Sequence, residues 1–220
     1  MNSLPRLIAN TFALLLAELI QPLFSVILVI AISRYLGPTG LGQYSFIITY
    51  VAIFEPVAAF GLREIITREV AKDHTAADRY LPTAFLFGTL ATVLCGVVMS
   101  VVVWLLSYPQ EVLKAVYLMA LYVFCSTLKA YLFAFFQAIE RLKQTALISL
   151  GETVFRVAGS LLLLTLGGQV LGLISLLVAG RALALLCALV MVRRVIGSIH
   201  YKIDLSLAKS LFPQAATFCA

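Results

Sequence analysis

Hydrophobic and polar positions follow one another along this chain in long blocks rather than residue by residue. Six apolar blocks reach the ~20 residues that an α-helix needs to cross the hydrocarbon core of a bilayer. They cover residues 7–33, 44–62, 81–107, 115–139, 146–166 and 170–192. None of them shows the period-two alternation of a membrane-barrel strand. The pattern therefore predicts an all-α integral membrane protein, a bundle of six transmembrane helices.

The segments between the blocks are short. Residues 34–43 read RYLGPTGLGQ, and their glycines and proline predict a tight reversal. A phosphate-binding loop is excluded because Gln43 and Tyr44, rather than Lys and Ser or Thr, follow the last glycine. Residues 63–80 carry mixed charges and predict a helical segment at the membrane surface. The connection 167–169 is so short that it predicts an antiparallel hairpin of the last two spans.

Composition supports a lipid-facing exterior. The chain is 62% hydrophobic and only 12% charged, whereas soluble domains carry ~25% charged residues. The four cysteines lie far apart in apolar runs, with neither metal-ligand spacing nor a disulfide framework. No Walker motif, metal-ligand cluster or catalytic Ser-His-Asp arrangement is readable in the sequence. We therefore expect no metal, no cofactor and no enzymatic activity.

The basic residues predict the orientation. With the N-terminus inside, eleven of them fall on the cytoplasmic side and two on the outer side, as the positive-inside rule requires. The eleven are Arg6, Arg63, Arg68, Lys72, Arg79, Arg141, Lys143, Arg193, Arg194, Lys202 and Lys209, and the two are Arg34 and Lys114. Anionic lipids of the inner leaflet then account for the net charge of +6 without nucleic acid. We expect a multi-pass protein of the cytoplasmic membrane with both termini cytoplasmic.

Charged residues within the spans are the candidates for function, because each costs ~2.5–3.5 kcal/mol at the bilayer centre even on a lenient scale. Helical spacing places them on polar stripes of the first, fourth and fifth spans, together with residues such as Gln21, Ser25, Tyr122, Ser126 and Ser149. Facing stripes would line a hydrophilic cavity inside the bundle.

Two interpretations of these charges stay open. Glu152 and Arg156 stand at i, i+4 with the acid first, which favours a neutralising pair; otherwise Arg156 binds substrate. Lys129 and Arg181 have no partner on their own helices, so they either pair with an acid of the first two spans or bind an anionic substrate. The acids either bind a coupling cation or balance the bases. The substrate-binding candidates are Lys129, Arg156 and Arg181, and the ion-coupling or charge-balancing candidates are Glu18, Glu55 and Glu152.

Two sequence stretches point to a family. ISRYLGPTGLGQYSF joins the first two spans, and AFGLREIITREVAKD follows the second. Together they resemble the N-terminal half of the polysaccharide (lipid-linked oligosaccharide) flippases of the multidrug/oligosaccharidyl-lipid/polysaccharide exporter superfamily. The resemblance implies the first of two helical lobes around a central cavity. It also implies transport of lipid-linked sugars to the outer leaflet by alternating access.

The expected domain organisation is a six-helix lobe over residues 1–204. Residues 205–220 begin an apolar run that is too short to span, which predicts a truncated seventh helix. Because the resembled family has two lobes, the missing second lobe or a second chain is the expected partner. A multidrug or small-molecule exporter of the same superfamily is the first alternative. The cavity of such an exporter should be acidic. Here three bases lie near the midplane, Lys129, Arg156 and Arg181, against two acids, Glu18 and Glu152. A membrane assembly subunit without transport activity is the second alternative.

Overall fold

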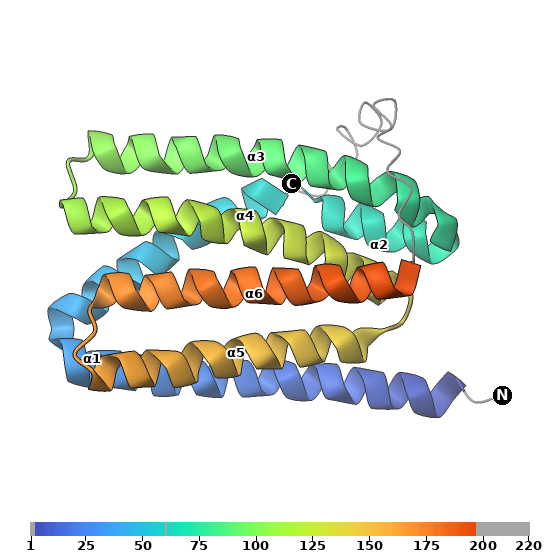
Figure 1. Ribbon diagram of the computed structural model, residues 1–220, viewed down its shortest axis with the longest axis horizontal. Helices are drawn as coiled ribbons and strands as arrows, with labels where there is room; N and C mark the ends of the chain where they lie inside the picture. Colours follow the sequence, from blue (N-terminus) through green and yellow to red (C-terminus); the bar gives the residue numbers. More distant parts are fainter. Residues whose placement is uncertain (1–2, 60, 197–220) are drawn as a thin grey trace.

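A computed structural model describes residues 3–59 and 61–196 of the chain, with the side chains of residues 19–59, 61–74 and 76–195. These residues are helical almost throughout, which confirms the predicted all-α class (Figure 1). The elements are α1 (Ser3–Ala59), α2 (Leu62–Lys72), the 3-10 turn η1 (His74–Ala76), α3 (Ala77–Leu105), α4 (Gln110–Ala138), α5 (Leu142–Thr165) and α6 (Val170–Ile196). The call of a seventh helix over residues 205–220 lies outside the described residues.

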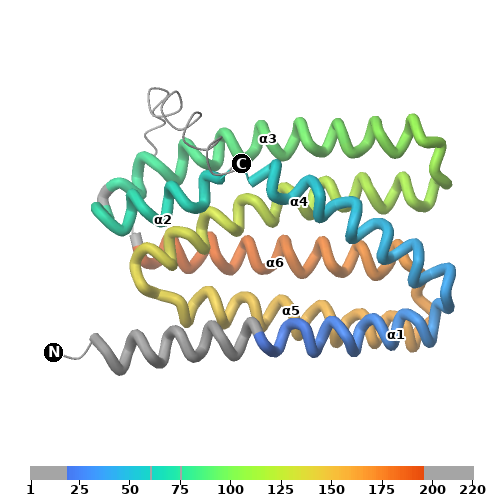
Figure 2. The backbone as a smooth tube through the Cα atoms, turned by 180° about the vertical axis from the view of Figure 1, so that it is seen from behind, coloured from blue at the N-terminus to red at the C-terminus, as the bar shows by residue number. Residues whose placement is uncertain are grey.

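Helix α1 consists of two arms that fold back on each other at Gly37 (Figure 2). Gly37 has φ 67° and ψ −173°, a conformation with positive φ that residues with a Cβ avoid. The first arm covers residues 3–36 and the second arm residues 38–59. At 1.5 Å per residue the second arm is roughly 33 Å long, enough to cross the ~30 Å hydrocarbon core. The two arms therefore correspond to the first two predicted spans, joined without the loop that the sequence suggested.

Five helices of the described residues are long and apolar enough to cross a membrane, and the two arms of α1 count as one of them. Helices α3, α4, α5 and α6 match the other four predicted spans to within a few residues. Figure 1 shows them side by side, with the second arm of α1 crossing behind α4. The described residues thus form a multi-pass membrane bundle in which the two arms of α1 are separate passes.

Helix α2 is the charged segment that was predicted to lie at the membrane surface. Its apolar face packs against α4, and its buried residues are Leu62, Ile65, Ile66 and Val70. On its polar face Glu69 accepts hydrogen bonds from Lys72 Nζ at 2.9 Å and Arg68 Nε at 2.8 Å. The hydrogen bond from Lys72 is the main reason why the pKa of Glu69 lies below its usual value. This amphipathic pattern explains why a charged segment still forms a helix.

Helices α3, α4 and α5 end in the same way, with a residue of positive φ just beyond the helix. These residues are Ser107 (φ 53°), Glu140 (φ 58°) and Gly167 (φ 81°). In each case the next amide donates to a carbonyl five residues earlier, as Gly168 N does to Leu163 O at 2.8 Å. This Schellman arrangement satisfies the last carbonyls of a helix and reverses the chain at once. It confirms the predicted hairpin between the last two spans and makes the other two connections equally short.

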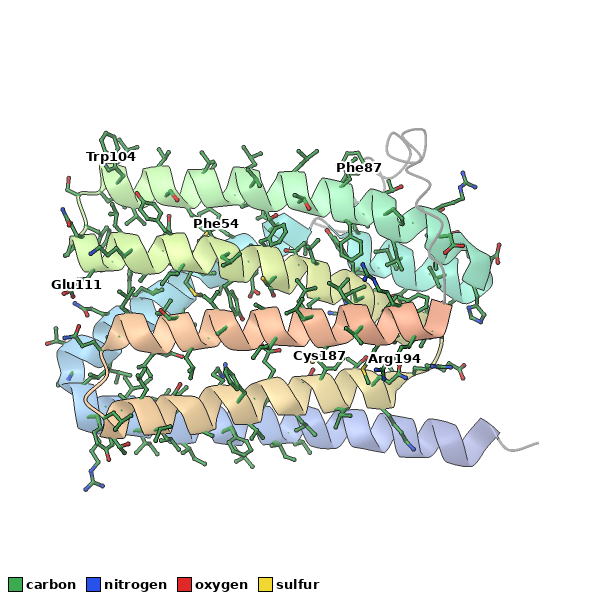
Figure 3. All side chains as sticks on the ribbon, viewed as in Figure 1. Phe54, Phe87, Trp104, Glu111, Cys187 and Arg194 are labelled. Atoms are coloured by element: carbon green, nitrogen blue, oxygen red, sulfur yellow. The ribbon has the colours of Figure 1, made fainter. Side chains whose placement is uncertain are left out.

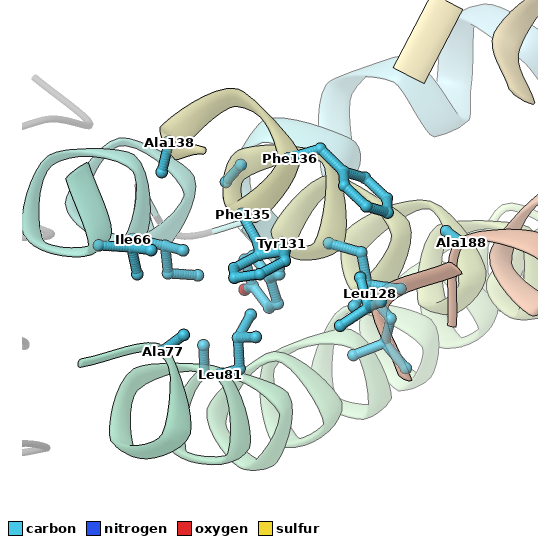
Figure 4. Packing of buried hydrophobic residues seen from close by; sticks show 14 of the residues in the cluster. Ile66, Ala77, Leu81, Leu128, Tyr131, Phe135, Phe136, Ala138 and Ala188 are labelled. Carbon is cyan, nitrogen blue, oxygen red and sulfur yellow. The ribbon is translucent and has the colours of Figure 1, made fainter. Parts of the chain in front are cut away.

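Helix α4 lies at the centre of the bundle and packs against α1, α2, α3 and α6. Its largest fully buried side chains are Tyr131 and Phe136. Figure 4 shows Tyr131 beside Leu81 of α3 and on the side of Ile66 of α2, whereas the Phe136 ring points away from both. The Tyr131 hydroxyl donates to the carbonyl of Ala59 at the end of α1, 3.2 Å away. This cluster fixes α2 and the end of the second arm onto α4.

The close contact between α3 and Tyr131 gives a first testable prediction. A Cβ at Gly88 would lie 2.5 Å from Tyr131 Cε2, and the tyrosine ring is fully buried. We expect Gly88→Leu to lower the free energy of unfolding by at least the ~1–3 kcal/mol of an overpacked core, visible as a lower Tm in detergent. Gly42→Leu is the matched control, because a Cβ there meets no atom within 4 Å. Equal Tm values for the two variants would contradict the packing described here.

The basic residues of the connections gather at one end of the bundle. The reversal at Gly37, the α3–α4 connection and the α5–α6 connection lie together at one end, and α2 and the α4–α5 connection lie at the other (Figure 1). The end with α2 carries Arg63, Arg68, Lys72, Arg79, Arg141, Lys143, Arg193 and Arg194, whereas the opposite end carries Arg34 and Lys114. Arg6, Lys202 and Lys209 lie outside the described side chains.

This division leads to a second prediction, about orientation. Because basic ends stay in the cytoplasm, we expect the α2 end to be cytoplasmic and the Gly37 end to be external. Reporter fusions at Asp73 and at Pro38 test this expectation. A reporter that works only outside the cytoplasm should be active at Pro38 and silent at Asp73. The reverse result would invert the orientation.

Candidate functional site: a buried ion cluster

Three charged side chains meet inside the bundle, one from each of α4, α5 and α6. Lys129 Nζ donates to Glu152 Oε2 at 2.7 Å. Arg181 Nε lies 3.0 Å from the other oxygen, Glu152 Oε1. This second contact is an ion pair rather than a directed hydrogen bond, because Nε of Arg181 has no hydrogen-bond partner. One carboxylate therefore holds two cations and ties three helices together.

Aromatic rings cover both cations of this cluster. The Arg181 guanidinium lies 4.6 Å from the centroid of the Tyr122 ring, and one of its Nη atoms donates to the Tyr122 hydroxyl. Lys129 Nζ lies 5.1 Å from the centroid of the Phe133 ring. Such cation–π contacts contribute ~2 kcal/mol or more when they are desolvated. They stabilise charges that a single carboxylate does not fully neutralise, and Lys129 is only 7% exposed.

Glu55 approaches the cluster from the second arm of α1. Ser126 Oγ donates to Glu55 Oε1 at 2.5 Å. Ser126 lies on α4 between Tyr122 and Lys129, one helical turn from each. Glu55 is half-buried and forms no ion pair with a described residue. It is therefore a second acid beside the cluster that is free of a direct cationic partner.

Arg156 lies on α5 and is held much less tightly. Its Nη2 lies 3.5 Å from Ser25 Oγ of the first arm, and its buried Nε has no hydrogen-bond partner. None of the ion pairs among the described residues includes Arg156. Its guanidinium is thus the underpaired cation of the bundle interior. With Lys129 and Arg181 against Glu55 and Glu152, the described interior carries one net positive charge.

The structure brings together most of the residues that the sequence singled out, but in different pairs. Glu152 contacts Lys129 and Arg181 rather than Arg156 on its own helix. A same-helix pair yields only ~0.2–0.5 kcal/mol, whereas a buried unpaired charge costs several kcal/mol, so the pairing across helices prevails. Glu55 bonds to Ser126 instead of a base, and the side chain of Glu18 lies outside those described.

Phe133 is the site residue that sequence reasoning missed. It follows Lys129 by four residues on α4, so its ring stands on the same helix face one turn away. That spacing was available in the sequence as a signal. An aromatic residue at such a position is usually part of an apolar face, however, and only the fold shows that Lys129 Nζ lies over it.

Comparison with known structures defines the class of fold. The chain superposes on a MOP superfamily transporter from Pyrococcus furiosus, for which a binding pocket of reverse polarity is described, with a TM-score of 0.71 at 14% sequence identity. The match covers 91% of this chain and 47% of the transporter. The chain thus has the fold of about half of a MOP superfamily transporter and spans about half of that protein's length.

A family model identifies the chain more narrowly. The model for the polysaccharide biosynthesis protein family matches residues 7–220, which is nearly the whole sequence. The chain therefore belongs to the polysaccharide biosynthesis protein family, as the resemblance in its first two connections suggested. A search of curated protein sequences gave no match.

Proposed function

We propose that this chain forms one lobe of a transporter that flips lipid-linked oligosaccharide or polysaccharide precursors across the cytoplasmic membrane by alternating access. Its family and its half-transporter fold support this proposal. The observation that carries it is the Arg156 guanidinium in the bundle interior, which lacks an acidic partner among the described residues. An exporter of small organic cations would instead need an interior with unpaired acidic side chains.

The chemistry of such a substrate suits this interior. A lipid-linked precursor has an anionic phosphate head and an apolar tail, so the head needs cationic groups and the tail can remain in lipid. A guanidinium binds phosphate oxygens in a bidentate manner through two parallel N–H groups. Arg156 has an unpartnered Nε and only one long contact at Nη2, and it is the first candidate for this contact.

The other charged residues take supporting roles in the proposal. Lys129 and Arg181 add positive potential and share Glu152, so they contact the phosphate only when the cluster opens. Glu55 and Glu152 balance charge, and Glu18 belongs to the same proposed group. Because two cations already occupy Glu152, Glu55 is the better placed of the two described acids to accept a coupling cation.

A cavity of alternating access has to close on both sides, so we propose that the lobe works with a second lobe, in the same polypeptide or in a second chain. The third prediction follows from this. In a strain that lacks its own flippase, the 220-residue chain alone should not restore surface polysaccharide, whereas a version extended through a second lobe should. Surface polysaccharide is measured by antibody labelling at matched membrane abundance.

Each outcome of this experiment decides something. Restoration by the extended version supports the transport of lipid-linked sugars. An extended version that reaches normal abundance and still leaves the precursor accumulated inside the cell would fail to transport it. That failure argues against lipid-linked sugars as the substrate class. Full restoration by the 220-residue chain would refute the need for a second lobe in the same polypeptide.

A further inference from the structure

Two apolar grooves run along α6 on its outer faces. The first, called here the α5–α6 groove, has a volume of about 530 Å³ and is lined by Leu147, Gly151, Phe155, Gly180, Cys187 and Arg194, among others. Figure 3 shows Cys187 and Arg194 projecting from α6 on the side of α5. Its volume lies within the ~300–1,000 Å³ of typical ligand sites. Nearly all of its lining is apolar. The two charged exceptions are Arg194 in the last turn of α6 and Glu152 of the ion cluster.

The second groove, called here the α3–α6 groove, lies on the other side of α6. It has a volume of about 460 Å³ and is lined by Leu81, Phe85, Leu128, Leu189 and Arg193, among others. This groove too is mainly apolar and has an arginine at the end of α6. The neighbouring residues Arg193 and Arg194 thus each close one groove at the same end of the bundle.

Glycines give the α5–α6 groove its depth. A Cβ at Gly151 would meet no atom within 4 Å, so it would point into open space in the groove. A Cβ at Gly180 would lie 3.1 Å from the Phe155 ring, so α6 offers bare backbone to that ring. Leu147, Leu186 and Val190 on the groove walls are half or more exposed. The groove is therefore open along one side, and its walls are apolar.

The length of the α5–α6 groove matches one leaflet. From Arg194 to Gly180 the helix rises over fourteen residues, which is roughly 21 Å at 1.5 Å per residue. Half of the ~30 Å hydrocarbon core is about 15 Å, and the polar headgroup region adds several more. The groove therefore reaches from headgroup depth at Arg194 to the middle of the bilayer.

Charge identifies the occupant that the grooves favour. Arg193 and Arg194 are exposed, and neither has an acidic partner among the described residues. A helix C-terminus accommodates basic side chains without any ligand, which explains their position but not the apolar grooves beneath them. An anionic phospholipid offers both matching parts, since its phosphate suits an arginine and its acyl chain suits an apolar groove.

We propose that the two grooves beside α6 bind anionic phospholipids, with the phosphates at Arg193 and Arg194 and the acyl chains along α6. Bound lipid fills the space between α6 and α5, and the space over α4 between α6 and α3. Helix α6 also supplies Arg181 to the ion cluster. The α5–α6 groove reaches Glu152 of the ion cluster, but the test of lipid binding needs no transport assay.

Native mass spectrometry of the full chain in detergent tests this proposal, with phosphatidylglycerol and phosphatidylcholine of identical acyl chains as probes. We expect up to two lipids to remain bound and phosphatidylglycerol to bind more tightly. Arg193→Gln with Arg194→Gln should weaken phosphatidylglycerol roughly 5-fold at each groove, the affinity equivalent of one basic side chain beside an anionic headgroup. Phosphatidylcholine should change little. Lys143→Gln, at the same end but outside both grooves, is the matched charge control.

A second variant tests the groove apart from its charge. Gly151→Leu fills the α5–α6 groove without a backbone clash and should remove one of the two bound lipids. Ala158→Leu, at an exposed α5 position outside the groove, should leave both. Soluble glycerol phosphate, which has the head without the chain, should not protect the protein against thermal unfolding.

Four results would overturn the proposal. An undiminished preference for phosphatidylglycerol after both arginines are replaced would show that they do not hold the headgroup. An unchanged number of bound lipids in Gly151→Leu would show that the groove holds no acyl chain. Protection by glycerol phosphate alone would reveal a site for free phosphate instead. A dimer that Gly151→Leu dissociates without affecting lipid binding would assign the groove to an interface between copies.

Discussion

Glu152→Gln is expected to be the most damaging single change in the bundle interior, with a loss of about 3–5 kcal/mol in the free energy of unfolding. The substitution removes the one carboxylate that contacts both Lys129 and Arg181. Two buried cations are then left with aromatic rings and a hydroxyl as their only strong partners. Membrane abundance and Tm in mild detergent should both fall sharply.

Rescue variants identify the cause of this loss. Lys129→Gln combined with Glu152→Gln should recover part of the stability, because one of the stranded cations is gone. Arg156→Gln combined with Glu152→Gln should not recover it, since Arg156 forms no ion pair with Glu152 in the structure. Recovery by the Arg156 combination, rather than by the Lys129 combination, would restore the same-helix pairing that the sequence left open.

Arg156→Gln is expected to have the largest effect on transport at near-normal abundance. This expectation rests on the proposed function. The variant is therefore tested in a two-lobe protein that restores surface polysaccharide. Losing a hydrogen bond to a charged group costs about 1.5–3 kcal/mol, which corresponds to roughly a 10- to 150-fold lower export rate. Arg156→Lys should keep part of the activity, because a point charge remains while the planar guanidinium is lost.

Lys129→Gln provides the contrast to Arg156→Gln. Lys129 is buried and bonded to Glu152, so its loss should reduce abundance before it reduces export per molecule. Export is therefore compared at equal membrane abundance, and precursor accumulation is measured alongside it. Normal export by Arg156→Gln at equal abundance would remove Arg156 from the substrate site and leave it a structural residue.

The sequence predicted the passes of this fold well because the bilayer imposes their length. The amphipathic α2 was also predictable, since its apolar positions recur with helical spacing within a charged segment. The direct junction of the first two spans was not predictable, because it depends on one non-helical residue, Gly37, taking the whole reversal. Turn-forming residues in the sequence show that the chain reverses, but they do not show how many residues leave the helical conformation.

The polar site was predictable as a set of residues but not as a set of pairs. Spacing along each helix placed Tyr122, Ser126 and Lys129 on one stripe of α4, and Ser126 indeed bonds to another helix. Which acid meets which base depends on how the helices are rotated and arranged, and periodicity does not contain that information. The only pair that sequence spacing offers is the one on the same helix, and here it is outcompeted by Lys129 and Arg181.

The shared carboxylate also bears on how the protein is made. During synthesis Lys129 leaves the ribosome 23 residues before Glu152, and Arg181 follows later still. Each of these charges alone opposes insertion of its helix by ~2.5–3.5 kcal/mol. Helix α4 is therefore expected to wait beside the translocon until α5 brings its acid, and α6 to join a preformed pair. We therefore expect α4, α5 and α6 to insert into the membrane as a single unit.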